Sequence, residues 1–185
     1  LVLLSGNQIG SLLAHYRSKT FLDLGLIPKE QRGNATLIKT FVTTNLQEEI
    51  AKFFGIRCVN TLTGFKYIGA KLTKYERQVR LPPGRLYKDL SEAESRRLRL
   101  EQSLFFVFGG EESYGYSGSD FVRDKDGNGA LVMFCELAAY AKSRGLTVPG
   151  LLDEMYQSLG YFEERLKSVV LEGAEGAAKI QKLAD

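Results

Sequence analysis

Cysteine and histidine are scarce in this sequence of 185 residues, which contains two cysteines and one histidine. Cys58 and Cys135 lie far apart, each inside an apolar stretch, so the sequence predicts neither a disulfide framework nor a metal knuckle and fits a reducing compartment. His15 falls in a predicted helix with neither cysteine near it, so it offers no catalytic triad and is interpreted as a packing or surface residue. The G-x-S-x-G, P-loop, C-x-x-C and H-E-x-x-H motifs are also absent.

Long apolar runs are missing as well. No stretch reaches the roughly eighteen apolar residues of a membrane helix, and no signal-peptide pattern opens the chain, so we expect a cytoplasmic protein with no membrane partner. The first residues, Leu1-Val2-Leu3-Leu4, read as if entered partway along an element, which favours an excised fragment of a longer protein. With 44% hydrophobic and 25% charged residues, the composition is that of an ordinary globular domain.

Positive charge is concentrated in one segment. The net charge is +3, but residues 71–102 contain nine Lys or Arg against five Asp or Glu, which leaves the remainder slightly negative. This segment has Pro82-Pro83-Gly84 at its centre and a capping box at Ser91 and Glu94, and we interpret it as a basic insertion between two core elements. A nucleic-acid-binding module is one interpretation of it; a solvated helix with many salt bridges is the more ordinary one, and we expect no nucleic-acid partner.

Apolar periodicity predicts alternating strands and helices. The predicted elements are a helix capped by Ser5, strand 35–43, a helix from Asn45 to Phe54 ended by Gly55, strand 56–59, a helix after Asn60, strand 103–108, a long buried helix 127–140 and a helix that opens at Thr147 and ends before Gly160. Such alternation favours a three-layer α/β/α domain with a mostly parallel or mixed sheet of about four strands. Residues 163–185, with a further strand in "RLKSVVLEG" and a short helix, are predicted to be a linker and the start of a next unit, so the domain covers residues 1–162.

Two polar segments follow the strand that ends at Phe108. "GGEES" (109–113) lies where open α/β sheets bind ligands, and its glycines would let the backbone turn tightly and be approached closely. A carboxylate and a serine there suit the hydroxyls of a sugar, although an exposed acidic turn is the simpler interpretation. "RDKDGNG" (123–129) matches the first positions of an EF-hand loop, but Cys135 occupies the place of the final glutamate; a capped helix start, with or without a bound anion, fits better.

Four blocks together resemble one family in order: "LSGNQIGSLLAHY" from Leu4, "TLTGFKYIG" from Thr61, "FGGEESYGY" from Phe108 and "VRDKDGNGALVMFCELAA" from Val122. The sequence resembles the third domain of the α-D-phosphohexomutases, the phosphoglucomutase and phosphomannomutase family. The resemblance implies an intramolecular phosphotransferase that interconverts hexose 1-phosphate and hexose 6-phosphate. A phosphoserine, Mg2+ and a 1,6-bisphosphate intermediate such as glucose 1,6-bisphosphate take part in that reaction.

The resemblance also implies residue roles. Glu111 and Ser113 would hold sugar hydroxyls, Thr63 and Gly64 would touch the sugar or its phosphate, and Lys125 would serve phosphoryl or proton transfer, with Arg123 as a further substrate contact. The phosphoserine and metal loops of the family are absent from this chain, so the resemblance implies a fragment that is inactive alone, with no metal ligands of its own. "EESYGY" favours a glucose phosphate substrate, and mannose or pentose phosphates remain alternatives.

Overall fold

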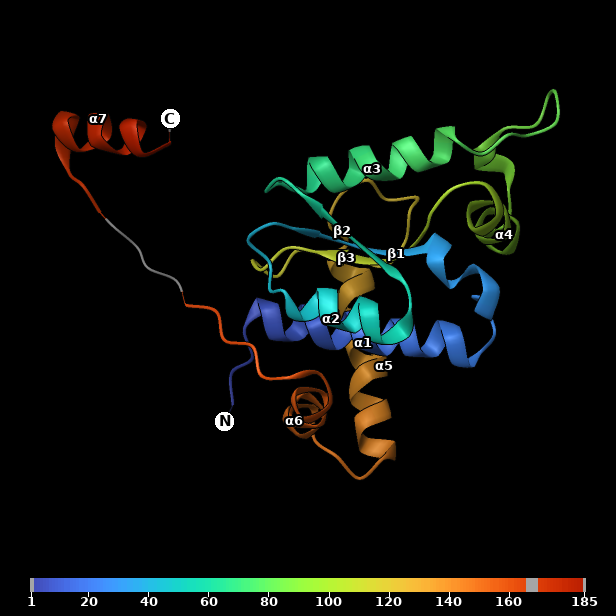
Figure 1. The fold of residues 1–185 in the computed structure, drawn as a ribbon, viewed down its shortest axis with the longest axis horizontal. Coiled ribbons are helices and arrows are strands. Elements are labelled where there is room, and N and C mark those ends of the chain that lie inside the picture. Colours follow the sequence, from blue (N-terminus) through green and yellow to red (C-terminus); the bar gives the residue numbers. More distant parts are fainter. Residues whose placement is uncertain (1, 166–169, 185) are drawn as a thin grey trace.

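The computed structural model describes residues 2–165 and 170–184 (Figure 1). Its centre is one four-stranded sheet with the order β2-β1-β3-β4. β1 (Ala35–Thr40) lies parallel to both β2 (Arg57–Thr61) and β3 (Phe105–Gly110), whereas β4 (Tyr116–Ser117) runs antiparallel to β3. The predicted mixed sheet of about four strands is therefore confirmed, although the two-residue β4 is an addition that the sequence did not indicate.

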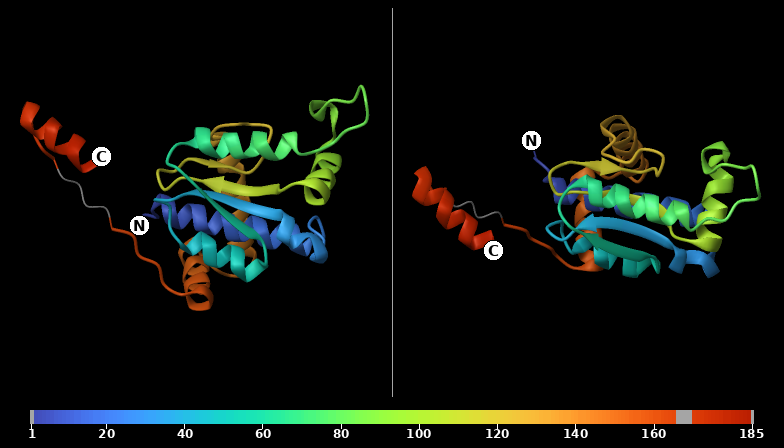
Figure 2. Two further views of the ribbon diagram at one scale, coloured as in Figure 1. Left: turned by 45° about the horizontal axis from the view of Figure 1, so that its top comes forward. Right: turned by 90° about the horizontal axis from the view of Figure 1, so that it is seen from above.

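Helices cover both faces of the sheet, which gives the predicted three layers (Figure 2). α1 (Gly6–Asp23) and α2 (Leu46–Phe54) pack on one face, and α3 (Phe65–Arg77) packs on the other. In Figure 1, α5 (Gly127–Ser143) crosses behind α1, and α6 (Val148–Leu159) lies below α1 and α2. α4 (Glu92–Gln102) stands at the end of the sheet where the parallel strands begin. Two apolar cores result: a large one among α1, α2, α5, α6 and the sheet, and a small one beneath α3.

Helix ends follow the sequence signals with one exception. Ser5 and Ser91 form the predicted capping boxes, and Gly55 ends α2 in the left-handed conformation. Asn45 occupies the predicted N-cap position of α2, but its side chain makes no cap hydrogen bond and instead accepts one from the Lys39 ammonium at 3.3 Å. Leu46 N donates to the Thr44 hydroxyl at 3.1 Å in its place.

α5 is less buried than its apolar sequence predicts. Only Met133, Leu137 and Ala141 are buried, on the face toward the core, whereas Leu131 and Val132 are 63% and 59% exposed. The continuous apolar sequence indicated a helix buried all round, but the helix lies on the outside of the α1 layer and uses only one face there.

β3 contains an irregularity that decides which way its last residues face. The register with β1 shifts between Thr36 and Leu37, which pair with Phe106 and Phe108, so Val107 is an extra residue. Val107 and Phe108 consequently both join the large core, and the alternation of faces is reversed for the residues that follow. Such a bulge leaves no signal in an apolar run.

The two glycines after Phe108 belong to the strand rather than to a turn. Gly109 and Gly110 pair with Ser117 and Tyr116 of β4, so the predicted tight turn at the glycines is wrong. Their close approach is confirmed, since a Cβ on Gly109 would lie 2.8 Å from the Ile38 carbonyl oxygen, and one on Gly110 would lie 2.8 Å from the Tyr116 ring.

Ion pairs occupy much of the basic segment 71–102. Its first residues, 71–77, form the end of α3, where Leu72 and Tyr75 are buried in the small core. On both sides of a 3₁₀ turn (Tyr87–Asp89), arginines of the segment pair with carboxylates; these are Arg85 with Glu94, Arg96 with Glu92, Arg97 with Glu101, and Arg99 with Asp120. The pairs leave less free positive charge for a nucleic-acid backbone, as expected of a solvated helix.

The C-terminal residues contain α7 (Gly173–Ala184), which lies apart from the three layers in Figure 1. The predicted strand falls within "RLKSVVLEG" (165–173); residues 166–169 of it lie outside the described residues, and residues 163–165 and 170–172 have no strand structure. In the described parts of the chain, no helix has the length and apolar character needed to cross a membrane.

His15 is a packing residue with a consequence for stability. Its ring lies 5.0 Å from the Phe54 ring, between α1 and α2, and burial lowers its pKa to about 4, with Lys19 and Arg144 acting in the same direction. In the unfolded chain the pKa is near the ordinary value of about 6.5. The unfolded state therefore takes up the proton first, and the His15 contribution is complete above about pH 6.5 and lost as the pH falls toward 4.

We expect lowering the pH from 7 to 5 to remove about 2 kcal/mol of unfolding free energy through His15 alone. Urea unfolding of the wild-type chain and of a His15→Leu variant at both pH values measures this contribution as the difference between their pH dependences. Equal pH dependences in the two proteins would contradict it.

Candidate functional site

The candidate site lies at the carboxyl ends of the parallel strands, where open α/β sheets bind ligands. The loops after β1, β2 and β3 meet there, together with the first turn of α1. The segment from β4 to α5 joins them because Asp126 N donates to the Tyr116 carbonyl at 2.8 Å. Asp126 then caps α5 by accepting from Gly129 N at 2.9 Å. The capped helix start predicted for "RDKDGNG" is thus confirmed.

Glu111 joins two of these loops. It is only 6% exposed, and its Oε1 accepts a hydrogen bond of 2.9 Å from Gly64 N, the residue that precedes α3. Gly64 has φ 116°, a conformation that favours glycine, so the loop after β2 delivers its N–H toward the carboxylate. The structure therefore brings together Glu111 and Gly64, which the sequence placed 47 residues apart.

Glu112 points to other partners than Glu111 does. Its Oε2 lies 3.5 Å from the Thr40 hydroxyl and 3.4 Å from that of Thr43, and these two hydroxyls bond each other at 2.8 Å. The main chain of Glu112 packs closely on α1: a Cβ added to Gly6 would lie 1.8 Å from the Glu112 carbonyl oxygen. The neighbouring carboxylates thus have separate tasks: Glu112 attaches the loop to β1 and α1, and Glu111 faces α3.

Lys125 lies beside Glu111. Its aliphatic stem packs on Gly115, where a Cβ would be 2.7 Å from the lysine Cδ and 3.4 Å from Glu111 Oε2. Its ammonium lies 5.6 Å from the centre of the Phe65 ring and 3.2 Å from Asp124 Oδ1, and the side chain is half exposed. A half-exposed cation therefore stands at the edge of a buried carboxylate, paired with the exposed Asp124.

Ser113 and Thr63 complete the predicted group on its solvent side. Both are exposed, and neither hydroxyl has a hydrogen-bond partner within residues 2–165 and 170–184, so both are free to bond a ligand. Tyr114, which lies between Ser113 and β4 in the chain, adopts φ 64°, which is unusual for a residue with a side chain. Backbone strain of this kind is frequent in loops that hold a ligand.

Arg123 is not brought to this group. Its guanidinium forms an ion pair with Glu76 near the end of α3, away from the Gly64 end of that helix. A Cβ on Gly69, midway along α3, would lie 2.6 Å from the Arg123 carbonyl oxygen, so the backbone of Arg123 crosses α3 there. The sequence placed Arg123 next to Lys125, but the structure separates their side chains along the length of α3.

Lys39 is a residue that the sequence reasoning missed. It is 1% exposed, its ammonium donates to the Thr43 carbonyl at 3.1 Å, and it pairs with Glu48 at 3.2 Å. A hydrogen bond from Asn60, together with Lys39, lowers the pKa of Glu48. Lys39 thereby fixes the loop that presents Thr43 to Glu112; a lone lysine within the apolar run "ATLIKT" was the available signal.

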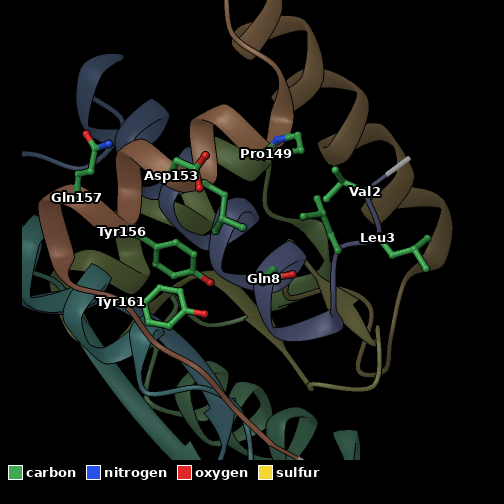
Figure 3. A pocket seen from close by; sticks show the side chains of 10 residues that line it. Val2, Leu3, Gln8, Pro149, Asp153, Tyr156, Gln157 and Tyr161 are labelled. Atoms are coloured by element: carbon green, nitrogen blue, oxygen red, sulfur yellow. The ribbon is translucent and has the colours of Figure 1, made fainter.

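A hollow of about 480 Å³ lies away from these residues (Figure 3). It is bounded by the N-terminal residues Val2 to Leu4, by Gln8 and by α6, with the rings of Tyr156 and Tyr161 in contact at one side. The predicted site residues do not line it. Its lining combines apolar residues with the polar side chains of Gln8, Asp153 and Gln157, but it includes no Lys or Arg that could face a phosphate group.

Chemically, the site at the strand ends offers a buried carboxylate, two free hydroxyls and a cation at one edge of the sheet. These groups suit a polyhydroxyl ligand that carries negative charge, because the carboxylate accepts from hydroxyls and the ammonium faces an anion. Within the described ranges, no group of three or more His, Cys, Asp or Glu side chains is placed to hold a metal ion. The EF-hand interpretation therefore finds no support, since Asp124 pairs with Lys125 and Asp126 caps α5.

The sequence matches the family model described as phosphoglucomutase/phosphomannomutase, alpha/beta/alpha domain III, over residues 5–84 and 88–159. The chain belongs to this family. The match includes nearly all of the basic segment, with residues 85–87 outside it.

Curated relatives and a solved structure agree with this assignment. The phosphoglucomutase of Staphylococcus epidermidis (strain ATCC 35984) is 31% identical over 179 residues, which cover 97% of this chain and 27% of the relative. That of Staphylococcus aureus (strain N315) is 30% identical, with 97% and 26% covered. The structure of parafusin, a phosphoglucomutase from Paramecium, shares the fold with a TM-score of 0.52 at 20% identity, covering 87% of this chain and 22% of that one. The chain spans about a quarter of the length of these relatives.

Proposed function

We propose that this chain is the sugar-binding domain of an enzyme that interconverts glucose 1-phosphate and glucose 6-phosphate through a phosphoserine and glucose 1,6-bisphosphate. The observation that carries the proposal is the buried Glu111 carboxylate, joined to Gly64 N and flanked by Lys125, on a chain whose family is that of the phosphoglucomutases. The names of the Staphylococcus relatives support glucose over mannose or pentose phosphates.

In this proposal, the residues of the chain bind and orient the sugar. Glu111 accepts from sugar hydroxyls while Gly64 N holds one of its oxygens, so the carboxylate is in place before the sugar arrives. Ser113 and Thr63 donate to and accept from the remaining hydroxyls or the phosphate. Lys125, at the edge of the group, stabilises negative charge on the phosphate or moves a proton at its oxygen.

Other groups of the reaction belong outside this chain under the proposal. The described residues hold no cluster that fits Mg2+, so its ligands and the phosphoserine would come from other domains of a longer protein. When bound there, Mg2+ would neutralise charge on the transferring phosphoryl group. The separate chain is accordingly expected to bind hexose phosphate without converting it.

Replacing Lys125 by alanine in the full-length protein tests the proposal. We expect the rate of glucose 1-phosphate to glucose 6-phosphate conversion, with Mg2+ and a trace of the 1,6-bisphosphate, to fall on the order of 10²-fold, about 2.7 kcal/mol of transition-state stabilisation. The matched control is Lys142→Ala, which removes a lysine at the far end of α5 and should leave the rate unchanged.

A wild-type protein that is well folded and converts no hexose phosphate would refute the proposed function. An active wild-type protein with an equally active Lys125→Ala variant would instead refute only the role of Lys125. Mannose 1-phosphate as the faster substrate would correct the choice of hexose.

A further inference from the structure

The segment that carries Lys125 has little backbone support of its own. β4 ends at Ser117 and α5 begins at Gly127, and within the described chain no hydrogen bond between backbone groups holds residues 119–125. The position of this segment therefore depends on side chains. Arg17 donates to the Gly118 carbonyl at 2.7 Å at its start, and Asp126 is held by Tyr116 at its end.

The buried guanidinium of Arg99, from the basic segment, holds residues 119–125 through Asp120. Arg99 of α4 is 1% exposed, and its Nη2 donates to Asp120 Oδ2 at 2.7 Å. Tyr87 donates to the same carboxylate oxygen at 3.0 Å and accepts from Arg99 Nε at 2.7 Å, so the three side chains form a closed triangle. The guanidinium also donates to the Leu72 carbonyl of α3 at 3.3 Å, which ties the triangle to the helix that follows Gly64. We call Tyr87, Arg99 and Asp120 the brace.

A buried ion pair of this kind contributes little net stability relative to apolar packing, because both charges leave water. Its geometric effect is large, since the planar guanidinium presents its donors in fixed directions. Asp120 is five residues before Lys125, and the brace joins that segment to α3 together with the Arg123–Glu76 ion pair. The first residue of α3, Phe65, lies under the Lys125 ammonium.

From this arrangement we infer that Tyr87, Arg99 and Asp120 are positioning residues that place Lys125 beside Glu111, and that the basic segment serves the site through them. The inference rests on the proposed function for its catalytic consequence. It assigns α4 and the 3₁₀ turn before it the task of holding the β4–α5 segment against α3.

The test has two arms. In the separate chain, Asp120→Asn should speed amide hydrogen exchange of residues 119–125 at least about tenfold while leaving β1 and α1 unchanged, because only the brace is loosened. In the full-length protein, the same change should lower kcat about tenfold with the KM for glucose 1-phosphate unchanged. The kcat loss should vanish in a Lys125→Ala background, since a residue that acts through Lys125 has no effect without it.

Tyr87→Phe serves as the milder variant where Asp120→Asn does not fold, and it should show the same pattern at smaller amplitude. Glu101→Gln, which removes the partner of exposed Arg97 on α4, is the matched control and should change neither readout. Unaltered exchange of residues 119–125 in both variants would overturn the inference whatever the activity. A kcat loss that persists in the Lys125→Ala background would overturn it too. Absence of turnover in the wild-type protein would mark failure of the proposed function, while the exchange arm would still decide whether the brace orders the segment.

Discussion

Glu111→Ala in the full-length protein is expected to lower kcat/KM for glucose 1-phosphate about 10³-fold, or about 4 kcal/mol. Two losses combine in this variant. The sugar would lose a carboxylate that accepts from its hydroxyls, and Gly64 N would lose its 2.9 Å acceptor, so the loop after β2 would no longer be fixed to the loop after β3. Steady-state kinetics over a range of glucose 1-phosphate concentrations measures the effect.

Glu112→Ala is the matched control, because it removes the adjacent carboxylate from the same loop. Glu112 contacts the Thr40 and Thr43 hydroxyls at 3.5 and 3.4 Å, which are long hydrogen bonds, whereas Gly64 N donates to Glu111. We expect less than about a tenfold loss in kcat/KM, since such contacts contribute little. A larger loss for Glu112→Ala than for Glu111→Ala would mean that the roles of the two carboxylates are reversed.

Gly6→Ala should destabilise the chain by about 3 kcal/mol, at the upper end of what overpacking costs. The added methyl group would lie 1.8 Å from the Glu112 carbonyl oxygen and 2.8 Å from its carbon, both of which are backbone atoms. Either α1 or the loop that carries Glu111 has to move, so the variant should also weaken sugar binding. Urea unfolding of the separate chain gives the stability change.

Gly127→Ala provides the comparison, since Gly127 is the first residue of α5 as Gly6 is of α1. No atom would lie within 4 Å of the new Cβ, and the residue has an ordinary backbone conformation. Alanine there should leave stability unchanged or raise it by about 0.5 kcal/mol. Equal effects at Gly6 and Gly127 would contradict the close packing of α1 on the Glu112 backbone.

Much of the fold could be predicted from local patterns. The caps at Ser5 and Ser91 depend on side chains that bond backbone groups three residues away, so their signal lies within one turn of sequence. The predictions failed where contacts with other elements decided the outcome. The Asn45 side chain does not bond the first turn of α2, because its oxygen accepts from buried Lys39, and α5 is half exposed because only one side of it meets α1.

The candidate site was predicted in part for the same reason. The residues of "GGEES" and "RDKDG" stood out because charged and small residues follow an apolar strand, and that contrast is local. Arg123 was grouped with Lys125 because the two are neighbours in sequence, yet the backbone crosses Gly69 there and directs Arg123 to Glu76. The division of tasks between Glu111 and Glu112 likewise depends on partners from α3, β1 and α1.

By itself, the sequence determined the alternation of strands and helices, the caps and the polar character of the strand ends, because these follow from side chains close together in the chain. Only the tertiary structure decided which carboxylate faces which loop. The extra residue Val107 reverses the alternation of β3, and the pairing with β1 that creates this bulge joins residues about 70 positions apart. The burial of Arg99 against Asp120 was decided in the same way, because its charge is compensated only when α4, α3 and the β4–α5 segment meet.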